Sequence, residues 1–221
     1  MNRVCASRMY DDLSDGGKVS PDPSQRQALQ RLDHLAEQLV LRKVWSGNRK
    51  GLFRRQSRES PERGLYLWGG VGRGKTFLMD LFVDSLPEGT AIRLHFHRFM
   101  NKVHERLAEL QGSENPLETV ADEVARSGKV LCLDEFFVSD ITDAMILGTL
   151  FDGMFRRGVA LVTTSNIEPE NLYEGGLQRD RFLPAISLIQ RYCETFKLDS
   201  ETDYRLRTLE RTSLYFTPCD S

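Results

Sequence analysis

Apolar residues near the N-terminus recur at intervals of three and four positions, the spacing that places side chains on one face of a helix. They are Leu29, Leu32, Leu35, Ala36, Leu39 and Val40. We therefore expect a helix that begins after Pro21 to Pro23 and packs this face against the rest of the protein. Residues 1–20 are polar, which predicts a poorly ordered terminus. A charged stretch from about Ser46 to Arg63, interrupted by Gly and Pro, predicts a loop.

From Gly64 onward, short apolar segments alternate with segments of helical periodicity. The apolar segments predict strands at Leu65–Trp68, Ile92–His97, Val130–Leu133, Val159–Thr163 and Cys193–Leu198. The segments between them predict helices at Lys75–Leu86, Arg98–Leu110, Asn115–Gly128 and, capped by Ser139, up to Arg157. This alternation indicates an α/β fold with a parallel, doubly wound sheet, in which ligands bind at the carboxyl ends of the strands.

A glycine-rich loop directly follows the first predicted strand. Gly69 and Gly74 enclose four residues and precede Lys75 and Thr76, which completes the P-loop pattern. The backbone N–H groups of such a loop surround a phosphate, because glycine has no Cβ in the way, and the next helix adds its positive end. Lys75 is predicted to contact the β- and γ-phosphates, and Thr76 to ligate Mg²⁺. The predicted nucleotide-binding residues are Gly69, Gly70, Val71, Gly72, Arg73, Gly74, Lys75, Thr76 and Phe77.

Polar side chains also follow two later strands. Asp134 comes directly after the apolar segment Val130–Leu133, where a carboxylate is placed to hold the water shell of Mg²⁺. Glu135 is placed to orient or deprotonate the attacking water. Asn166 follows the next predicted strand, and its amide is expected to hydrogen-bond the γ-phosphate or that water. Capping of the turn that contains Pro169 is the structural alternative for Asn166.

Two arginines, Arg179 and Arg181, lie close together further along the chain. A guanidinium supplied to the nucleotide of a neighbouring subunit would stabilise the charge of the transition state. We favour Arg181 for this role, and a salt bridge within the subunit, for example to Asp180, is the alternative.

Other candidate sites have less support. His95, His97 and His104 could form a metal site, but no cysteine or second carboxylate stands at a matching spacing. Phe99 and Met100 could grip a translocating substrate, although packing in the core is the more ordinary role for such side chains. The sequence contains no Asn-Lys-x-Asp segment that would read guanine, so adenine, and hence ATP, is expected by exclusion.

The composition sets limits on partners. The net charge of −2 argues against nucleic acid as an obligatory partner. The basic segment from Arg42 to Arg63 is expected to be a solvated linker, with a local basic patch as the alternative. The four cysteines show no metal spacing, and no signal-peptide core or apolar run of roughly 20 residues is present. These features predict a cytoplasmic protein whose contact with a membrane is at most peripheral.

The motifs above lie within longer segments that carry a family resemblance. These segments are PDPSQRQALQRL, RGLYLWGGVGRGKTFLMDLF, RLHFHRFM, LDEFFVSDITDAMIL, LVTTSN, GLQRDRFLPAI and DYRLRTL. Together they cover nearly everything from Pro21 onward except the basic linker. On these segments the sequence resembles the AFG-like branch of the AAA+ superfamily, which includes bacterial cell-division ATPases and has mitochondrial relatives in eukaryotes.

The resemblance implies a P-loop AAA+ fold with the sheet order 5-1-4-3-2 and an N-terminal helical extension. Carried over by position, it implies nucleotide contacts for Lys75 and Thr76, Walker B roles for Asp134 and Glu135, and a first-sensor role for Asn166. It also implies ATP hydrolysis with Mg²⁺, work between the subunits of a homo-oligomeric ring, and association with the division protein FtsZ at the division site.

The same resemblance suggests three parts. They are an N-terminal tail, helix and basic linker (1–63), an AAA+ ATPase core (64–198), and the start of a C-terminal region (199–221). Family members continue beyond the position of Ser221, so we expect a lid and a second sensor arginine to be missing from this chain. Ring assembly and full turnover by this chain are therefore left open.

The sequence favours a Mg²⁺-dependent ATPase of the AAA+ type that acts in cell division. Two alternatives belong to other classes. One is an ATP-binding adaptor that turns over slowly because its lid is absent. The other is a helicase-loader-like ATPase linked to DNA, for which Arg54, Arg55 and Arg58 would supply phosphate contacts.

Overall fold

The computed structural model describes residues 5–47 and 61–199 of the chain. In chain order its elements are α1 (Ala6–Asp15), α2 (Pro23–Gly47), β1 (Gly64–Trp68), α3 (Lys75–Ser85), β2 (Ala91–His95), α4 (Phe96–Glu109), α5 (Pro116–Ser127), β3 (Val130–Asp134), α6 (Ile141–Arg156), β4 (Ala160–Ser165), the 3₁₀ turns η1 (Pro169–Asn171) and η2 (Arg179–Arg181), α7 (Leu183–Tyr192) and β5 (Cys193–Lys197). Strands and helices alternate after residue 63, as the apolar pattern predicted.

The strands form one parallel sheet in the order β2-β3-β4-β1-β5. Counted from β5 this is the order 5-1-4-3-2, so the predicted fold is confirmed. The interior strands β3 and β4 are buried along their whole length, whereas β2 at the edge is partly exposed. Because parallel strands all end at the same edge of a sheet, the segments that follow β1, β3 and β4 meet there.

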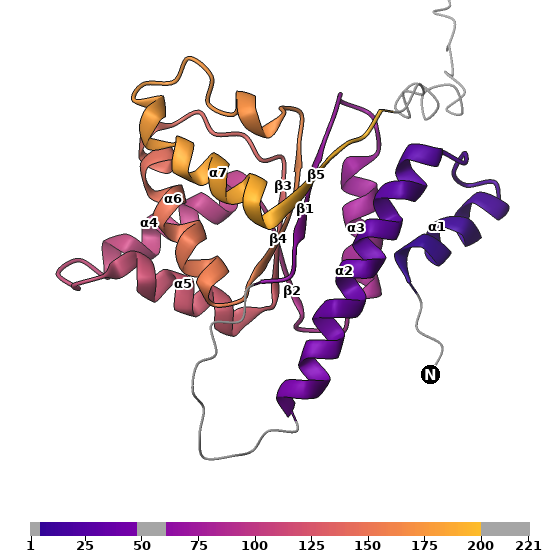
Figure 1. Cartoon of the computed structure of the whole chain (residues 1–221), viewed down its shortest axis with the longest axis horizontal. Coiled ribbons are helices and arrows are strands. Elements are labelled where there is room, and N and C mark those ends of the chain that lie inside the picture. Colours follow the sequence, from indigo (N-terminus) through magenta and orange to yellow (C-terminus); the bar gives the residue numbers. More distant parts are fainter. Residues whose placement is uncertain (1–4, 48–60, 200–221) are drawn as a thin grey trace, which may run out of the picture.

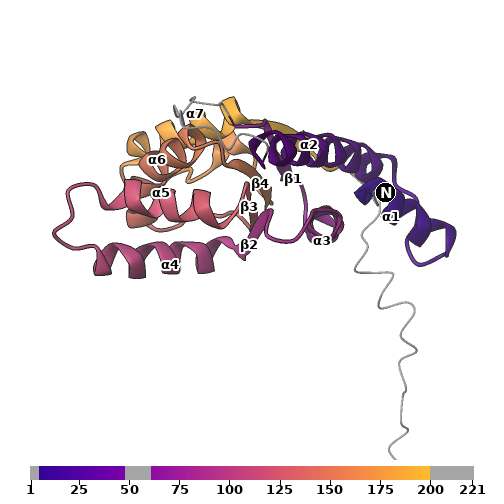
Figure 2. The ribbon, with the colours of Figure 1, turned by 90° about the horizontal axis from the view of Figure 1, so that it is seen from below.

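Helices cover both faces of the sheet, as Figures 1 and 2 show. The helices α4 to α7 lie on one face, and Leu131 and Leu133 of β3 belong to the core cluster on that face. The helices α1 to α3 lie on the other face, where Val130 and Cys132 belong to a second cluster. Alternate side chains of one strand thus enter two separate cores, which explains why this strand is continuously apolar.

The N-terminal region contains a helix where the sequence predicted poor order. The carboxylate of Asp33 in α2 accepts hydrogen bonds from the first backbone N–H groups of α1, 2.7 Å from Ala6 N and 3.1 Å from Ser7 N. Tyr10 is buried, and its hydroxyl accepts a hydrogen bond from the N–H of Asp22. The prediction for residues 6–15 was wrong because these contacts come from α2 and its approach, beyond the reach of local composition.

The starts of the helices α4 and α6 differ from the prediction. The strand β2 ends at His95 and α4 begins at Phe96, so His97 belongs to a helix. The chain turns at this point because Phe96 is buried in the core beneath the helix. Ser139 does not cap α6; the carboxylate of Asp140 accepts the hydrogen bond from the backbone N–H two residues on, at 2.6 Å.

The helix α7 is missing from the sequence-based prediction. It begins with Leu183 and Pro184, and proline is favoured in the first turn of a helix. Its apolar residues Ala185, Ile186 and Ile189 have helical spacing and are buried, but the run of ten residues is short and follows a long polar loop. A helix this short owes its formation to packing rather than to its own propensity.

Some predictions fall outside the described part of the chain. Residues 48–60, which include Arg54, Arg55 and Arg58 of the basic segment, and residues 200–221 are not described. The division of the chain at residues 63 and 198 stays a prediction. Within the described ranges, none of the helices has the length and hydrophobicity needed to span a lipid bilayer.

Candidate functional site

The glycine-rich loop connects β1 to α3 at the carboxyl edge of the sheet. Two of its glycines are required by their surroundings. Gly69 has a φ of 149°, and a Cβ there would lie 2.6 Å from the carbonyl oxygen of Leu198. Gly74 has a φ of 85°, and a Cβ there would lie 2.6 Å from Nε2 of Gln25. The backbone of this loop therefore follows a course that residues with side chains do not readily adopt.

Lys75, the first residue of α3, folds back over the loop. Its ammonium group donates hydrogen bonds to the carbonyl oxygens of Gly69 at 2.8 Å and Gly70 at 2.7 Å. It also donates to Oδ1 of Asn166 at 2.8 Å, across 91 positions of sequence. Lys75 and Asn166, which the sequence analysis selected separately, thus lie together at the ends of β1 and β4.

The other predicted loop residues occupy different environments. Val71 is 51% exposed, and Thr76 is exposed at the start of α3. The carbonyl oxygen of Arg73 accepts a hydrogen bond from Gln25 Nε2 at 2.9 Å. Phe77 turns away from the loop, and its ring lies 6.3 Å from that of Tyr10 in α1. The side chain of Phe77 packs on the apolar core of the α3 face. Its nucleotide-binding role stays a prediction.

Asp134 ends β3 and is buried, with 2% of its surface exposed. Its Oδ2 accepts a hydrogen bond from Nε of Arg93 at 2.9 Å, and its Oδ1 lies 3.5 Å from the hydroxyl of Thr164. Burial lowers the pKa of Arg93, but hydrogen bonds to Asp134 and Asp80 outweigh burial and raise that pKa overall. The carboxylate of Asp134 is thus held by a permanently charged partner.

Glu135 lies beside Asp134 but faces solvent. Its φ of 56° is unusual for a residue with a side chain, and its N–H donates to the hydroxyl of Thr164 at 3.1 Å. The side chain is 75% exposed, and its Oε2 lies 3.8 Å from Nδ1 of His95. The left-handed turn therefore separates the directions of two adjacent carboxylates, one buried in the sheet edge and one accessible to water.

The oxygen atoms of Thr76 and Asp134 suit Mg²⁺, which prefers hydroxyl, carboxylate, phosphate and water ligands. Within residues 5–47 and 61–199, no group of three or more His, Cys, Asp or Glu residues could hold a metal ion. The alternative site of His95, His97 and His104 is not assembled, because Nε2 of His104 lies 2.6 Å from Oδ1 of Asp143. The residues present fit a metal that the nucleotide helps to bind.

The structure distinguishes the two candidate arginines. Arg179 donates to the backbone carbonyl of Leu172 at 3.4 Å and to that of Glu170, so its guanidinium holds the loop before η2. The side chain of Arg181 is exposed. Exposure is what a residue that acts on another subunit requires, and this supports the choice of Arg181. The roles of both arginines stay predictions.

Gln25 and Arg93 were not among the site residues predicted from the sequence. Gln25 is 1% exposed and bonds the P-loop from the first turn of α2. Its position within a polar segment gave no sign of this contact. Arg93 stands at a polar position of the alternating pattern Ile92, Arg93, Leu94, His95, which is also the pattern of a strand with one exposed face. This pattern did not reveal that the partner of Arg93 is a buried carboxylate.

Solved structures share this architecture. The AMPPCP-bound DnaA of Aquifex aeolicus matches with a TM-score of 0.55 and 16% identity, over 88% of this chain and 52% of that one. The DnaC helicase loader matches with a TM-score of 0.52 and 17% identity, over 87% of this chain and 99% of that one. At this identity the likeness shows the fold alone, which is that of the P-loop AAA+ proteins.

Sequence comparisons are more specific. The cell division protein ZapE of Escherichia coli strain K12 is 48% identical over 227 residues, which cover 99% of this chain and 60% of that protein. Lactation elevated protein 1 homolog B of Danio rerio is 35% identical over 250 residues, covering 91% of this chain and 50% of that protein. This chain therefore spans only 50–60% of the length of these relatives. The family model described as AFG1-like ATPase matches residues 4–221. The chain belongs to the AFG1-like ATPase family.

Proposed function

We propose that this chain hydrolyses ATP with Mg²⁺ as part of an AAA+ motor. One observation carries the proposal: Lys75 Nζ lies 2.8 Å from Oδ1 of Asn166, so the P-loop and the end of β4 form one site. Asp134 is the last residue of β3 and Glu135 directly follows it. Because β3 pairs with β4, these two carboxylates complete the proposed site from the neighbouring strand. Membership of the AFG1-like ATPase family supports the same activity.

Each residue has a role that its environment suits. The N–H groups of the loop and the start of α3 bind phosphate oxygens, and Lys75 exchanges its carbonyl acceptors for the β- and γ-phosphates. Bound Mg²⁺ would neutralise charge on those phosphates, with Thr76 and Asp134 as its protein ligands. Glu135, exposed to water, accepts a proton from the attacking water or orients it. Asn166 directs its amide at the same water or at the γ-phosphate.

The biological setting rests on the relatives. Because ZapE is a cell division protein and is 48% identical over 99% of this chain, we assign this chain to bacterial cell division. FtsZ, or another division protein, is the partner that the family resemblance supports. A homo-oligomeric ring, to which each subunit contributes an arginine, is the assembly that this resemblance supports.

An ATPase assay on the chain tests the core of the proposal. Lys75→Ala should abolish both ATP binding and hydrolysis, because it removes the charge that contacts the phosphates. Glu135→Gln should keep ATP binding and lower the hydrolysis rate by about 10²- to 10⁴-fold, the range expected when a general base is removed. Lys102 is exposed on α4, and Lys102→Ala serves as the control. This variant should hydrolyse ATP like the wild type.

One outcome would contradict the proposed hydrolysis, and another would contradict the proposed setting in cell division. Tight ATP binding by the wild type without hydrolysis, at any protein concentration, would favour the ATP-binding adaptor. DNA binding that weakens with salt and disappears when Arg54, Arg55 and Arg58 are neutralised would favour the DNA-linked ATPase instead.

A further inference from the structure

We propose that Arg93, braced by Asp80, is a positioning residue that fixes the Asp134 carboxylate toward the Mg²⁺ of the bound nucleotide. The inference rests on the proposed function and adds a residue that neither motif analysis nor family membership assigns. It follows from three observations: the face of the sheet on which Arg93 lies, the burial of Asp134, and the position of Asp80 on the helix that also carries Thr76.

The strand register places Arg93 on the α3 face of the sheet. Arg93 pairs with Cys132 of β3, and Cys132 lies in the cluster shared by α1, α2 and α3. Asp134 is two residues beyond Cys132, so its side chain lies on the same face. Arg93 therefore stands between the sheet and α3, at the point where β3 ends.

The burial of Asp134 makes its partner important. Its side chain is only 3% exposed, whereas that of Arg93 is 27% exposed and that of Asp80 is 49% exposed. A buried carboxylate is costly unless a charged or hydrogen-bonding group compensates it. Nε of Arg93 supplies this compensation to Oδ2 at 2.9 Å, and another nitrogen of the same guanidinium bonds Asp80. Because the guanidinium is planar and rigid, the two bonds fix its orientation.

Asp80 relates this bridge to the nucleotide site. It lies four residues after Thr76 in α3, so both side chains lie on the same side of that helix. The bridge from Asp80 through Arg93 to Asp134 thus joins the helix that carries one predicted Mg²⁺ ligand to the strand that carries the other. Because Arg93 bonds Oδ2 of Asp134, the carboxylate cannot rotate freely, and its other oxygen, Oδ1, keeps one direction. An ion pair that only stabilised the edge of the sheet would have no reason to affect Mg²⁺.

The test measures how strongly Mg²⁺ tightens nucleotide binding. The dissociation constant of a fluorescent, non-hydrolysable ATP analogue is determined in EDTA and again in excess Mg²⁺. In Arg93→Gln, we expect the Mg²⁺-dependent tightening to fall by about tenfold or more, the usual effect of losing a group that orients a metal ligand. The affinity in EDTA should change little. Asp80→Asn should also reduce the Mg²⁺-dependent tightening, but by less. Arg93 then loses its ion pair with residue 80 and keeps the one with Asp134.

Arg106→Gln is the matched control. Arg106 also bridges two carboxylates, Glu109 and Glu123, but on α4 and away from the P-loop. Its replacement should leave the tightening unchanged. Arg93→Lys covers the case in which Arg93→Gln does not fold, because lysine keeps the charge but cannot hold two carboxylates in a fixed geometry. It too should lose a measurable part of the tightening.

Several results would overturn this inference. Unchanged tightening in folded Arg93→Gln or Arg93→Lys would refute it, as would an equal loss of affinity in EDTA and in Mg²⁺, since that indicates general damage to the loop. A wild-type chain that binds no ATP analogue would refute the proposed function itself, and the inference with it. The wild-type measurement therefore separates the two failures.

Discussion

The ammonium group of Lys75 joins the P-loop to the end of β4 in the candidate site. Oδ1 of Asn166 and two loop carbonyls share the ammonium group of Lys75, so one amide connects segments 91 positions apart in sequence. The amide has no charge and can accept or donate, which suits contact with a lysine, a phosphate or a water molecule in turn. Phosphate binding by the loop and Lys75 can therefore be separated from a role of Asn166 in hydrolysis.

Replacing Asn166 should separate these two steps. In Asn166→Ala we expect the affinity for ATP to change by less than about tenfold, because the loop and Lys75 remain, and hydrolysis to fall by about 10²-fold, because a group that positions the reacting water is lost. Equilibrium binding and single-turnover kinetics measure the two effects. Asn171→Ala, an exposed residue of η1, is the control. Equal losses in binding and rate would argue against this role.

The backbone conformation of Gly74 and its closeness to Gln25 lead to a prediction about stability. Gly74→Ala should destabilise the fold by about 1–2 kcal/mol from its φ of 85° alone, and should further displace Gln25, whose Nε2 lies where the new Cβ would contact it. Adding Gln25→Ala to Gly74→Ala should remove the cost of displacing Gln25, and the cost of the backbone strain should remain. Urea unfolding of both single variants and the double variant measures the coupling.

Gly89→Ala provides the comparison for this cycle. Gly89 has a φ of 71°, but a Cβ there would meet nothing within 4 Å. It should therefore cost only the strain of the backbone and show no coupling to Gln25. If Gly74 and Gly89 behave alike in both respects, the contact with Gln25 has no energetic importance.

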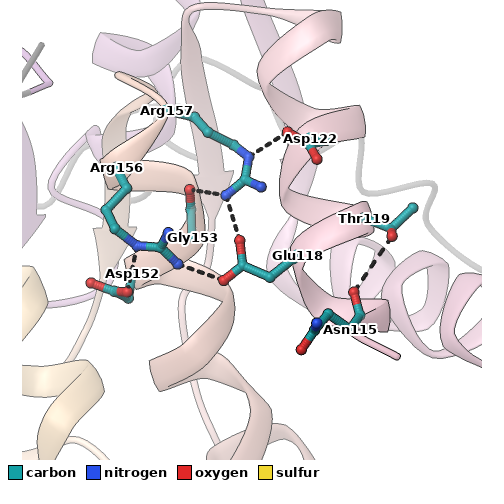
Figure 3. Close-up of polar contacts among 8 residues, drawn as sticks. All are labelled: Asn115, Glu118, Thr119, Asp122, Asp152, Gly153, Arg156 and Arg157. Carbon is teal, nitrogen blue, oxygen red and sulfur yellow. Dashed lines mark hydrogen bonds and ion pairs between the residues drawn. The ribbon is translucent and has the colours of Figure 1, made fainter. Parts of the chain in front are cut away.

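Pairs of helices are joined by charge as well as by apolar packing. Figure 3 shows Glu118 of α5 between Arg156, the last residue of α6, and Arg157, which directly follows that helix. Asp122 accepts a further hydrogen bond from Arg157. The helices approach closely here, since a Cβ at Gly153 would lie 3.0 Å from that of Ala121. Hydrogen bonds from Arg157 and then from Arg156 lower the pKa of Glu118 below its ordinary value of 4.5.

This network predicts a pH dependence. A carboxylate whose pKa is lower in the folded state stabilises the protein above pH 4.5, and this contribution disappears as the pH falls through the folded-state pKa. Glu118→Gln should therefore be less stable than the wild type at pH 7, by about 1 kcal/mol or roughly 2–4 °C in Tm for this partly exposed network. The difference should shrink toward pH 3. Thermal unfolding at both pH values measures it.

Glu114→Gln is the control for the same experiment, because Glu114 is exposed just before α5. Its Tm should follow that of the wild type at both pH values. A Glu118→Gln deficit that stays constant from pH 7 to pH 3 would show that its cause is packing rather than charge.

Elements also show what local sequence can and cannot predict. The strand β3 and the P-loop were predictable because buried parallel strands are continuously apolar and a phosphate loop requires glycine at fixed spacing. The helix α1 was not, since Asp33 of α2 accepts hydrogen bonds from its first N–H groups and Tyr10 is buried against the segment before α2. Arg93 was overlooked for a similar reason: its partners Asp80 and Asp134 lie 13 and 41 positions away. Contacts between distant segments leave little trace in periodicity.

The whole molecule places its candidate groups at one edge of the sheet and leaves Arg181 exposed near α7. Arg179 is engaged by the backbone of its own subunit, whereas Arg181 is accessible to a neighbouring one. If subunits form a ring, Arg181 is the arginine that could reach the nucleotide of the next subunit. Assembly is thus part of the proposed chemistry.

Mixed oligomers test this idea. Arg181→Ala alone should lower hydrolysis by about 10³-fold if it acts as an arginine finger. When it is mixed with Glu135→Gln, part of the activity should return, because a Glu135→Gln subunit can supply Arg181 to an intact Glu135 on its neighbour. Mixed assemblies must be verified by mass before rates are compared. No recovery in verified mixed oligomers would indicate that Arg181 acts within its own subunit or not at all.

The position of β2 at the edge of the sheet has a consequence for amide hydrogen exchange. The amides of β3 and β4 lie inside the sheet and should exchange only when the whole domain unfolds, whereas β2 has a strand partner on one side within the described residues and should open locally. Such an opening would carry Arg93 away from Asp134 while β1 and the P-loop stay folded. Transient fraying of β2 would then free the carboxylate of Asp134 while the P-loop still binds phosphate. The arrangement that holds the predicted metal ligand would therefore be shorter-lived than the arrangement that binds phosphate.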